Sequence, residues 1–252
     1  MENLKIQHLS YSSIALFNRC PREWWLKYRY GITSAPTAPL AFGTAIHRTV
    51  QQALLLGGLD NENTAHFAEW LRSAATESKI RILKPEFDEL VKTGMGILQS
   101  EMIQYLVNTI KVSTMEQIEV KVEFEVPGVP LPIIGYIDII DDDGHPYDIK
   151  TSKWDWEEGR ADEEVQPDFY LTALDLVGDH RHGGKFTHLI LTKTPGAPAG
   201  YTITTEREDY QSKVFEMVQR MWKGVEDHEW EQEVVRDACA YCRLKSPCYY
   251  NK

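Results

Sequence analysis

Hydrophobic and polar positions follow two different periods along the chain, and the change comes near residue 117. Before it, apolar residues recur at intervals of three and four, as in amphipathic helices. The serine-rich stretch Leu9 to Ser13 predicts a capped helix, and Pro21 suits the first position of a second helix that ends near Tyr30. Thr33 to Pro39 holds two prolines and is expected to be a loop. Further helices are predicted over residues 44–56, 63–77 and 85–111.

After residue 117 the pattern is typical of strands. The segment IEVKVEFEV alternates apolar and polar residues, and IIGYIDII, the turn DDDGH and PYDIK follow it. HLILT and YTITT predict two more strands. Pro167 fits the first turn of a helix over 167–177, and a last helix is expected over 207–225. The order of helices and strands indicates an α/β protein with a helical N-terminal portion and a cysteine-bearing tail.

Length and composition indicate one ordinary globular domain. The chain has 252 residues, of which 42% are hydrophobic and 26% charged. We therefore expect a single domain over 1–252, with a mainly helical portion (1–115), an α/β core (116–225) and a tail (226–252). The sequence contains no apolar run of about 20 residues and no signal-peptide pattern at its start. A cytoplasmic location is expected, with no membrane partner.

Charge is distributed unevenly. The net charge is −11, yet residues 1–31 and 236–252 each carry +3, which leaves −17 for the middle. Phosphate binding needs a local basic surface rather than a basic chain. The two basic ends also hold all four cysteines, so they would form one basic patch if they meet. Two lightly charged termini are the alternative.

Asp138 and Asp148 flank the turn DDDG, and both lie five positions from Asp143. Antiparallel strands joined there would place the two aspartates opposite each other, although a slip of one residue stays open. Lys150 leaves its strand on the same face as Asp148. Such a group suits phosphodiester hydrolysis, because carboxylates bind Mg²⁺ or Mn²⁺ and a lysine stabilises developing charge. The alternative is a surface hairpin with an ion pair.

Three further polar residues are candidates for the same site. His47 is expected in the first turn of a helix, whose N-terminus disfavours the protonated imidazole and leaves a neutral nitrogen for a metal. Gln166 and Tyr170 are four positions apart on one helix face and would reach phosphates or base edges. The alternatives are a hydrogen-bonded boundary position for His47 and a core position for Tyr170.

Four cysteines form the last pattern. Cys239, Cys242 and Cys248 lie within ten residues, and Cys20 is the fourth. Because disulfides are rare in the cytoplasm, metal ligation is the leading interpretation. Four thiolates suit zinc or a [4Fe–4S] cluster equally well. Either group would join the first helix to the tail, whereas four unrelated thiols are the alternative.

Taken together, these segments resemble the RecB-like PD-(D/E)XK nucleases that carry a four-cysteine iron–sulfur cluster. LSYSSIALFNRCPREWWLKY resembles their opening motif, GTAIH the histidine motif, GYIDII the aspartate motif, DIKTS the D/E-x-K motif and QPDFY the Q-x3-Y motif. The tail resembles the cluster motif of AddB-type and CRISPR-associated RecB-like exonucleases. The motifs occur in family order across nearly the whole chain. The loop expected over 155–164 is unusually acidic and departs from the family pattern.

The resemblance implies a restriction-endonuclease-like core with a mixed sheet flanked by helices, and it assigns roles to individual residues. Asp138, Asp148 and Lys150 would be catalytic. The expected metal ligands are His47, Asp138, Asp148 and the carbonyl of Ile149. DNA would be positioned by Gln166 and Tyr170. The implied ligands of a [4Fe–4S] cluster, or less favourably of zinc, are Cys20, Cys239, Cys242 and Cys248.

We expect a deoxyribonuclease that uses Mg²⁺ or Mn²⁺ and acts as an exonuclease on single-stranded DNA ends. The chain contains no P-loop pattern and thus no helicase motor of its own. We favour a free-standing exonuclease in recombination, repair, phage DNA processing or CRISPR adaptation. The other possibility is a subunit with a helicase, recombination or CRISPR protein as its partner. One alternative is a non-catalytic DNA-binding module or helicase-partner subunit, although the intact acidic set argues against it. The other is a zinc-stabilised RNA-binding protein, for which the strand IEVKVEFEV offers only Phe124 as a stacking residue.

Overall fold

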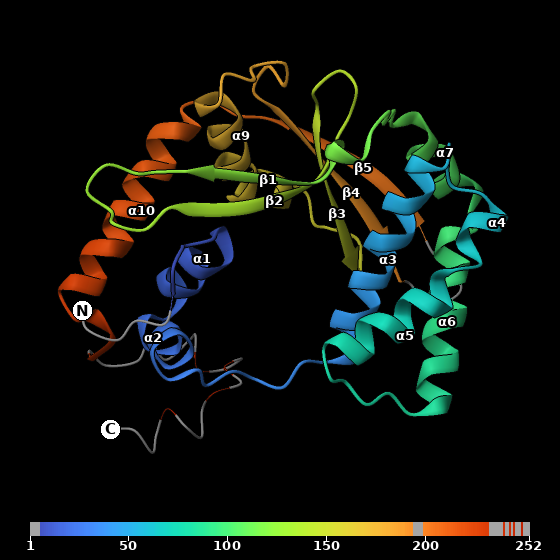
Figure 1. The fold of residues 1–252 in the computed structure, drawn as a ribbon, viewed down its shortest axis with the longest axis horizontal. Helices are drawn as coiled ribbons and strands as arrows, with labels where there is room; N and C mark the ends of the chain where they lie inside the picture. Colours follow the sequence, from blue (N-terminus) through green and yellow to red (C-terminus); the bar gives the residue numbers. More distant parts are fainter. Residues whose placement is uncertain are drawn as a thin grey trace.

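The computed structural model describes residues 6–193 and 199–231 together with four positions of the tail, Cys239, Cys242, Leu244 and Cys248. The remaining tail residues, including the basic residues expected to complete the patch, lie outside the described residues. Figure 1 shows a sheet that arches between two groups of helices.

The sheet has five strands, as predicted, and their spatial order follows their order in the chain. Neighbouring strands are antiparallel except β3 and β4, so the sheet is mixed. The parallel pair needs a crossover, and α9 (Gln166–Leu176) lies in the connection between its two strands. The strands are β1 (Ile118–Phe124), β2 (Ile133–Ile140), β3 (Pro146–Ser152), β4 (Lys185–Thr192) and β5 (Ala199–Glu206).

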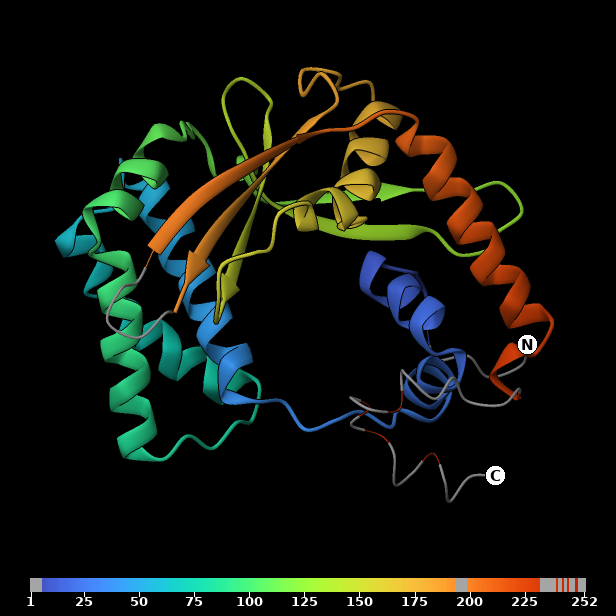
Figure 2. The same ribbon diagram turned by 180° about the vertical axis from the view of Figure 1, so that it is seen from behind.

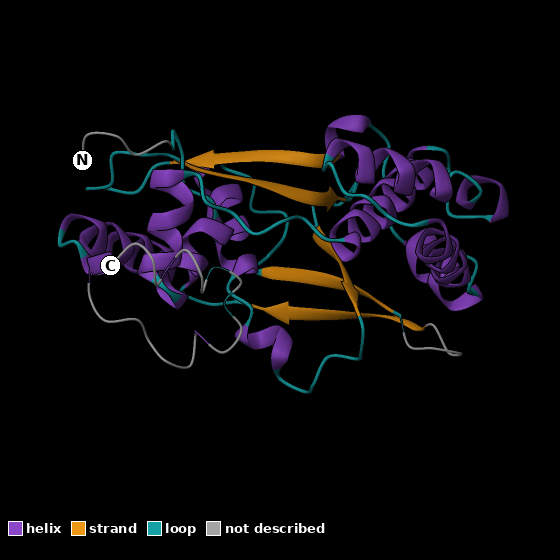
Figure 3. Cartoon of the chain, turned by 90° about the horizontal axis from the view of Figure 1, so that it is seen from below, coloured by secondary structure: helices purple, strands orange, loops and turns teal. Residues whose placement is uncertain are grey.

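The helices form two groups on opposite sides, which Figures 2 and 3 show from behind and from below. One group packs through Ile14, Phe169 and Met221. It consists of α1 (Tyr11–Arg19), α2 (Pro21–Tyr30), α9 and α10 (Tyr210–Glu226). The other group packs on Ile149 and Leu189 of the sheet. It comprises α3 (Ala38–Leu55), α4 (Asn61–Thr64), α5 (Phe67–Glu77), α6 (Lys84–Leu98) and α7 (Glu101–Thr109). The helical N-terminal portion is therefore divided between both sides.

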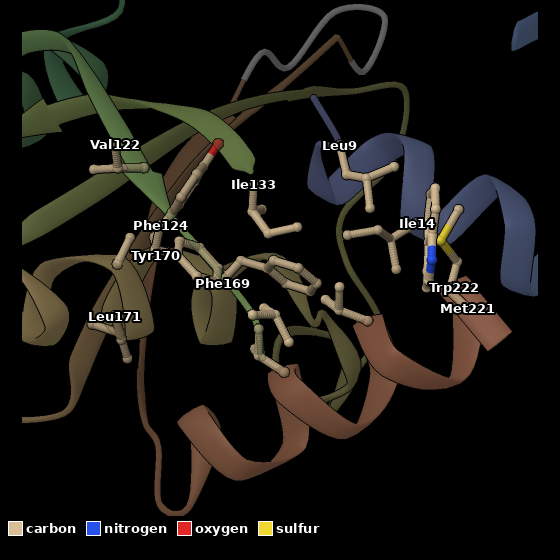
Figure 4. Packing of buried hydrophobic residues seen from close by; sticks show 14 of the residues in the cluster. Leu9, Ile14, Val122, Phe124, Ile133, Phe169, Tyr170, Leu171, Met221 and Trp222 are labelled. Atoms are coloured by element: carbon tan, nitrogen blue, oxygen red, sulfur yellow. The ribbon is translucent and has the colours of Figure 1, made fainter. Parts of the chain in front are cut away.

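The start of α1 is fixed to the sheet. The Leu9 amide donates to the Pro132 carbonyl, and the Leu9 carbonyl accepts from Ile134, both at 2.8 Å. Ser10 then caps α1 as predicted, through reciprocal hydrogen bonds with Ser13. The side chain of Leu9 is buried, and Figure 4 shows it near Ile14 and Ile133. These contacts set the opening segment directly against β2.

Several predicted helix boundaries were wrong. The helix α3 begins at Ala38 rather than Thr44, because Pro39 occupies its first turn, where a proline is tolerated. The helix predicted over 85–111 is two helices that meet at Gln99 and Ser100. The 155–164 segment contains a short helix, α8 (Arg160–Glu163), where a loop was expected. No helix among the described residues is long and apolar enough to cross a membrane.

Candidate active site

The centre of the site is a fork between β2 and β3. The two strands pair at Ile139–Tyr147 and Ile140–Pro146, and this register sets Asp138 across from Asp148, as predicted. At Asp138 the side chain replaces a backbone partner, since its Oδ2 accepts a hydrogen bond from the Ile149 amide at 2.7 Å. Both aspartates are buried, with 8% and 3% of their surfaces exposed. The hairpin thus holds two carboxylates that have little access to solvent.

Asp148 belongs to a network with Lys150 and α9. The Lys150 ammonium lies 3.0 and 2.9 Å from the two oxygens of Asp148 and donates to Gln166 Oε1 at 2.6 Å. The Gln166 amide in turn donates to Asp148 Oδ1 at 3.0 Å and to the Tyr170 hydroxyl at 2.9 Å. The structure therefore brings Gln166 and Tyr170, the two residues expected to position DNA, into one network with Asp148 and Lys150. The sequence did not predict these hydrogen bonds of the Gln166 amide.

Asp138 belongs to a second group, with His47 and Glu119. The nearest donor atoms of these three side chains all lie within 4.8 Å of one another, close enough to share one metal ion. His47 Nδ1 is 3.3 Å from Asp138 Oδ1. Gln51 donates to the Glu119 carboxylate at 2.8 Å and thereby holds it in place. The hollow of about 640 Å³ that opens here is lined by both His47 and Glu119.

Glu119 was missed by the sequence analysis. The register of β1 on β2 places it across from Asp138, but that register follows from the folded sheet. Its φ is +51°, in the left-handed region that a non-glycine residue adopts only at a cost of roughly 1–3 kcal/mol. Strain of this kind clusters at functional sites. The alternation of IEVKVEFEV by itself gives no reason to connect this exposed glutamate with Asp138.

The surroundings of His47 differ from the prediction. The residue lies well inside α3 and not in its first turn, so the helix N-terminus does not set its charge. Burial by itself would lower the pKa of His47, but the contact with Asp138 and the charges of both aspartates raise it above the ordinary value. Gly43 lets α3 approach this closely, because a Cβ atom there would lie 3.4 Å from Thr151 Oγ1.

The pKa of Asp148 is held below its ordinary value. Burial acts in the opposite direction and would raise it, but His188 and Lys150 outweigh that effect. A lowered pKa favours the ionised carboxylate, which is the form that pairs with Lys150. His188 was also missed by the sequence analysis, which read HLILT only as a strand. The parallel register of β3 and β4 sets it beside Asp148.

The described cysteines lie near one another but away from the fork. Burial raises the pKa of Cys20, and the neighbouring Cys242 contributes to the increase. The pKa of Cys242 is in turn raised by burial and by the proximity of Cys248 and Cys239. Two sulfur atoms accept backbone hydrogen bonds, Cys20 from Glu23 at 3.4 Å and Cys242 from Leu244 at 3.3 Å. All four thiols are free.

Two solved structures were compared with this fold. Among solved structures, the chain is similar to a "Putative exonuclease" from Eubacterium rectale, with a TM-score of 0.63 and 15% identity over 98% of this chain and 88% of that chain. That likeness shows the fold. It is also similar to SSO0001, with 16% identity over 79% of this chain and 91% of that chain, but the TM-score of 0.34 carries no argument. The curated proteins contain no match.

The family is shown by a sequence model. The model described as the PD-(D/E)XK nuclease superfamily matches residues 8–249, which include the opening segment, the fork, the start of α9 and the cysteines. The fork fits this match, because its two aspartates and Lys150 converge on one place. The expected fold, a mixed sheet flanked by helices, is the fold found. The chain therefore belongs to the PD-(D/E)XK nuclease superfamily.

Proposed function

We propose that this protein is a metal-dependent deoxyribonuclease that degrades single-stranded DNA from its ends. The observation that carries the proposal is the convergence of Asp138, Asp148 and Lys150 at one fork of the sheet, with His47 facing the same carboxylates. Membership in a nuclease superfamily supports phosphodiester cleavage. The preference for DNA ends rests on the resemblance of the motifs to RecB-like exonucleases.

The donor set fits Mg²⁺ or Mn²⁺. His47, Glu119 and Asp138 offer one nitrogen and two carboxylates within 4.8 Å, and the nitrogen favours Mn²⁺ more than Mg²⁺. Asp148 adjoins this group through the Ile149 amide that binds Asp138, so it would share the same ion together with the Ile149 carbonyl. A cation held there supplies Lewis-acid stabilisation of the phosphate and a more acidic water.

The other residues would act on the phosphate itself. Lys150 is fixed from two sides, by Asp148 and by Gln166, which leaves its remaining hydrogen for the attacking water or a phosphate oxygen. A donor held in advance in a site of low dielectric costs no reorganisation during the reaction. Gln166 and Tyr170 would hold the strand indirectly, by fixing Lys150, as well as by direct contact.

The four cysteines would hold an iron–sulfur cluster with a structural role. The backbone amides that donate to Cys20 and Cys242 are the kind of hydrogen bond that stabilises thiolate ligands. The preference for [4Fe–4S] over zinc rests on the resemblance of the cysteine tail to the cluster motif of RecB-like exonucleases, since four thiolates suit both groups.

The test compares linear and circular single-stranded DNA of equal length. We expect cleavage of linear DNA labelled at either end with Mg²⁺ or Mn²⁺, none with a chelator, and intact circles. Product lengths from the two labels also give the direction of degradation. Cleavage of circles at the same rate would contradict the dependence on ends, and no cleavage by metal-loaded protein would contradict the activity.

A further inference from the structure

A separate cavity of about 290 Å³ lies beside the fork. It opens between the start of α1, strands β1 and β2, and the start of α9. Gln166 and Tyr170 line it, so it begins where the Asp148 network ends. The hollow that contains His47 and Glu119 is lined by a different set of residues. Its volume, at the lower end of the roughly 300–1,000 Å³ of ligand pockets, suits a single small group.

The walls of the cavity are mainly aromatic and aliphatic. The rings of Tyr11 and Phe169 lie 5.5 Å apart, and Figure 4 shows Phe124 and Tyr170 on the same side of the sheet. Ser10 and Ser12 also line the cavity, and their hydroxyl oxygens lie 3.0 Å apart. Aromatic rings combined with a few hydrogen-bonding groups are the means by which proteins hold unpaired bases.

Gly135 lets the ring of Tyr170, which lines the cavity, pack closely against β2. A Cβ atom there would lie 3.0 Å from this ring and 3.5 Å from Val122, so a side chain would displace the ring. The glycine has no positive φ that would require it, and the close approach of Tyr170 gives it a physical reason. The GYIDII segment thereby sets the position of one wall of the cavity.

We propose that this cavity holds the base of an unpaired deoxynucleotide next to the phosphate that is cleaved. The inference rests on the proposed nuclease function and adds to it the group that selects single strands. Gln166 connects the two places, because it lines the cavity and also contacts Asp148 and Lys150. A base in a duplex is stacked and paired and must leave the helix to enter. Single-stranded DNA needs no such step.

The test uses single-stranded oligonucleotides with one abasic residue at successive positions from a labelled end. An abasic residue at the cavity position should lower the cleavage rate by roughly 5- to 100-fold, because base–aromatic stacking is lost there. We expect wild-type protein to pause at one product length set by the abasic position. Tyr11→Ala should slow the normal substrate and abolish the pause, whereas Tyr11→Phe should keep it.

Two controls separate this inference from other failures. Tyr105→Ala removes an exposed aromatic ring on α7 and should behave as wild type. Ser12→Trp closes the mouth from an exposed position and should act like Tyr11→Ala, even if the latter folds poorly. Equal rates for every abasic position in an active wild-type nuclease would overturn the cavity proposal and leave the nuclease function intact. An inactive wild-type protein would instead overturn the function.

A second inference comes from the histidine behind Asp148. His188 is fully buried on β4, and neither ring nitrogen has a hydrogen-bond partner within the described residues. Its Nδ1 lies 3.6 Å from Asp148 Oδ2, and the rings of Trp156 and Phe186 lie 5.1 and 5.2 Å away. A buried imidazole without a hydrogen-bond partner destabilises the folded protein, so its presence at this position calls for an explanation.

The geometry points to His188 as a positioning residue that orients the Asp148 carboxylate through Nδ1. The flanking aromatic rings leave the imidazole little freedom to turn, and a shift of a few tenths of an ångström completes the hydrogen bond. Substitution of a group that holds a metal-binding carboxylate in place typically lowers metal affinity by roughly 10- to 100-fold. In the proposed role, His188 acts only through Asp148 and would contact neither the phosphate nor the cation.

The test measures Mn²⁺ binding to the protein without DNA. His188→Leu should weaken Mn²⁺ by about 10- to 100-fold, and His188→Asn, which keeps a nitrogen at the δ position, should restore most of it. In an Asp148→Asn background the leucine substitution should have no further effect on Mn²⁺. His182→Leu, at a buried histidine remote from Asp148, controls for lost stability. Unchanged Mn²⁺ affinity in folded His188→Leu, or an equal loss in the Asp148→Asn background, would overturn the inference.

Discussion

The fork and the cysteine end are held together in different ways. At the fork, Asp138 and Asp148 are ten positions apart, and their geometry is set by the hairpin register and by a hydrogen bond of 2.7 Å from the Ile149 amide to the Asp138 carboxylate. At the other end, Cys20 and Cys239 are more than 200 positions apart in sequence. Among the described residues, the first helices are joined to the C-terminal part by a hydrogen bond of 3.4 Å from Arg22 to the Trp230 carbonyl and by the stacked rings of Trp25 and Trp230, 3.8 Å apart.

In the proposed function, the fork would carry out the chemistry and the cysteine end would stabilise the fold. The carboxylates are held by strand pairing and by hydrogen bonds within the protein. The proposed cluster would instead stabilise the cysteine end, since metal binding to a site absent in the unfolded chain adds to the folding free energy. Substitutions at the fork should therefore abolish chemistry and spare stability. Substitutions at the cysteines should do the reverse.

The largest effect is expected at Lys150. Lys150→Met removes the ammonium that Asp148 and Gln166 hold, and should lower the cleavage rate by about 100- to 1,000-fold, as loss of a charge-stabilising donor does. Lys153→Met removes an exposed lysine three positions away and serves as the control. Single-turnover rates on linear single-stranded DNA measure both variants. Similar rates for the two would contradict the role of Lys150.

Cys20→Ala should affect assembly instead. Loss of one ligand should release the group at the chain ends and destabilise the protein by more than about 2 kcal/mol. Iron and sulfide analysis of anaerobically purified protein, about four of each per chain in the wild type, and thermal unfolding test this. Asp148→Asn should keep the full iron content. Colourless wild-type protein with one zinc per chain would contradict the cluster, and unchanged stability of Cys20→Ala would contradict the clamp.

A smaller effect is expected at the metal group. His47→Ala removes the nitrogen and should weaken Mn²⁺ by about 10-fold while Mg²⁺ changes less, because imidazole suits transition metals better. Glu119→Gln should weaken both ions. The exposed His66→Ala is the matched control. Metal titrations of activity and of binding check the order, and identical curves for His47→Ala and wild type would argue against this ligand.

The smallest effect is expected at Tyr170. Tyr170→Phe keeps the buried ring and removes only the hydroxyl that accepts from Gln166. A single neutral hydrogen bond contributes about 0.5–1.5 kcal/mol, so we expect a decrease in rate of roughly 2- to 10-fold at unchanged stability. Tyr105→Phe on the surface controls for the substitution. Equal activity of Tyr170→Phe and wild type would leave that residue only its packing role.

The sequence predicted local features better than long-range ones. The five strands, the Ser10 cap and the pairing of Asp138 with Asp148 follow from turn chemistry and alternation over a few residues. The start of α3 was misplaced because Pro39 can be read either as a loop residue or as the first turn of a helix.

Glu119 and His188 were missed for a different reason. Each lies beside an aspartate only through the register between strands, from β1 to β2 and from β4 to β3. A parallel pair has no hairpin turn to fix its register, so nothing local to HLILT points to Asp148. The positive φ of Glu119 is likewise a property of the folded sheet.

The most direct test is the rate at which folded Asp148→Asn protein releases nucleotides from end-labelled linear single-stranded DNA with Mn²⁺. The substitution keeps the shape of the side chain and removes the charge that faces Lys150 at 2.9 Å. We predict a loss of several orders of magnitude relative to wild type, with iron content unchanged and the fold intact. A wild-type rate in this variant would contradict the assignment of the fork as the site of cleavage.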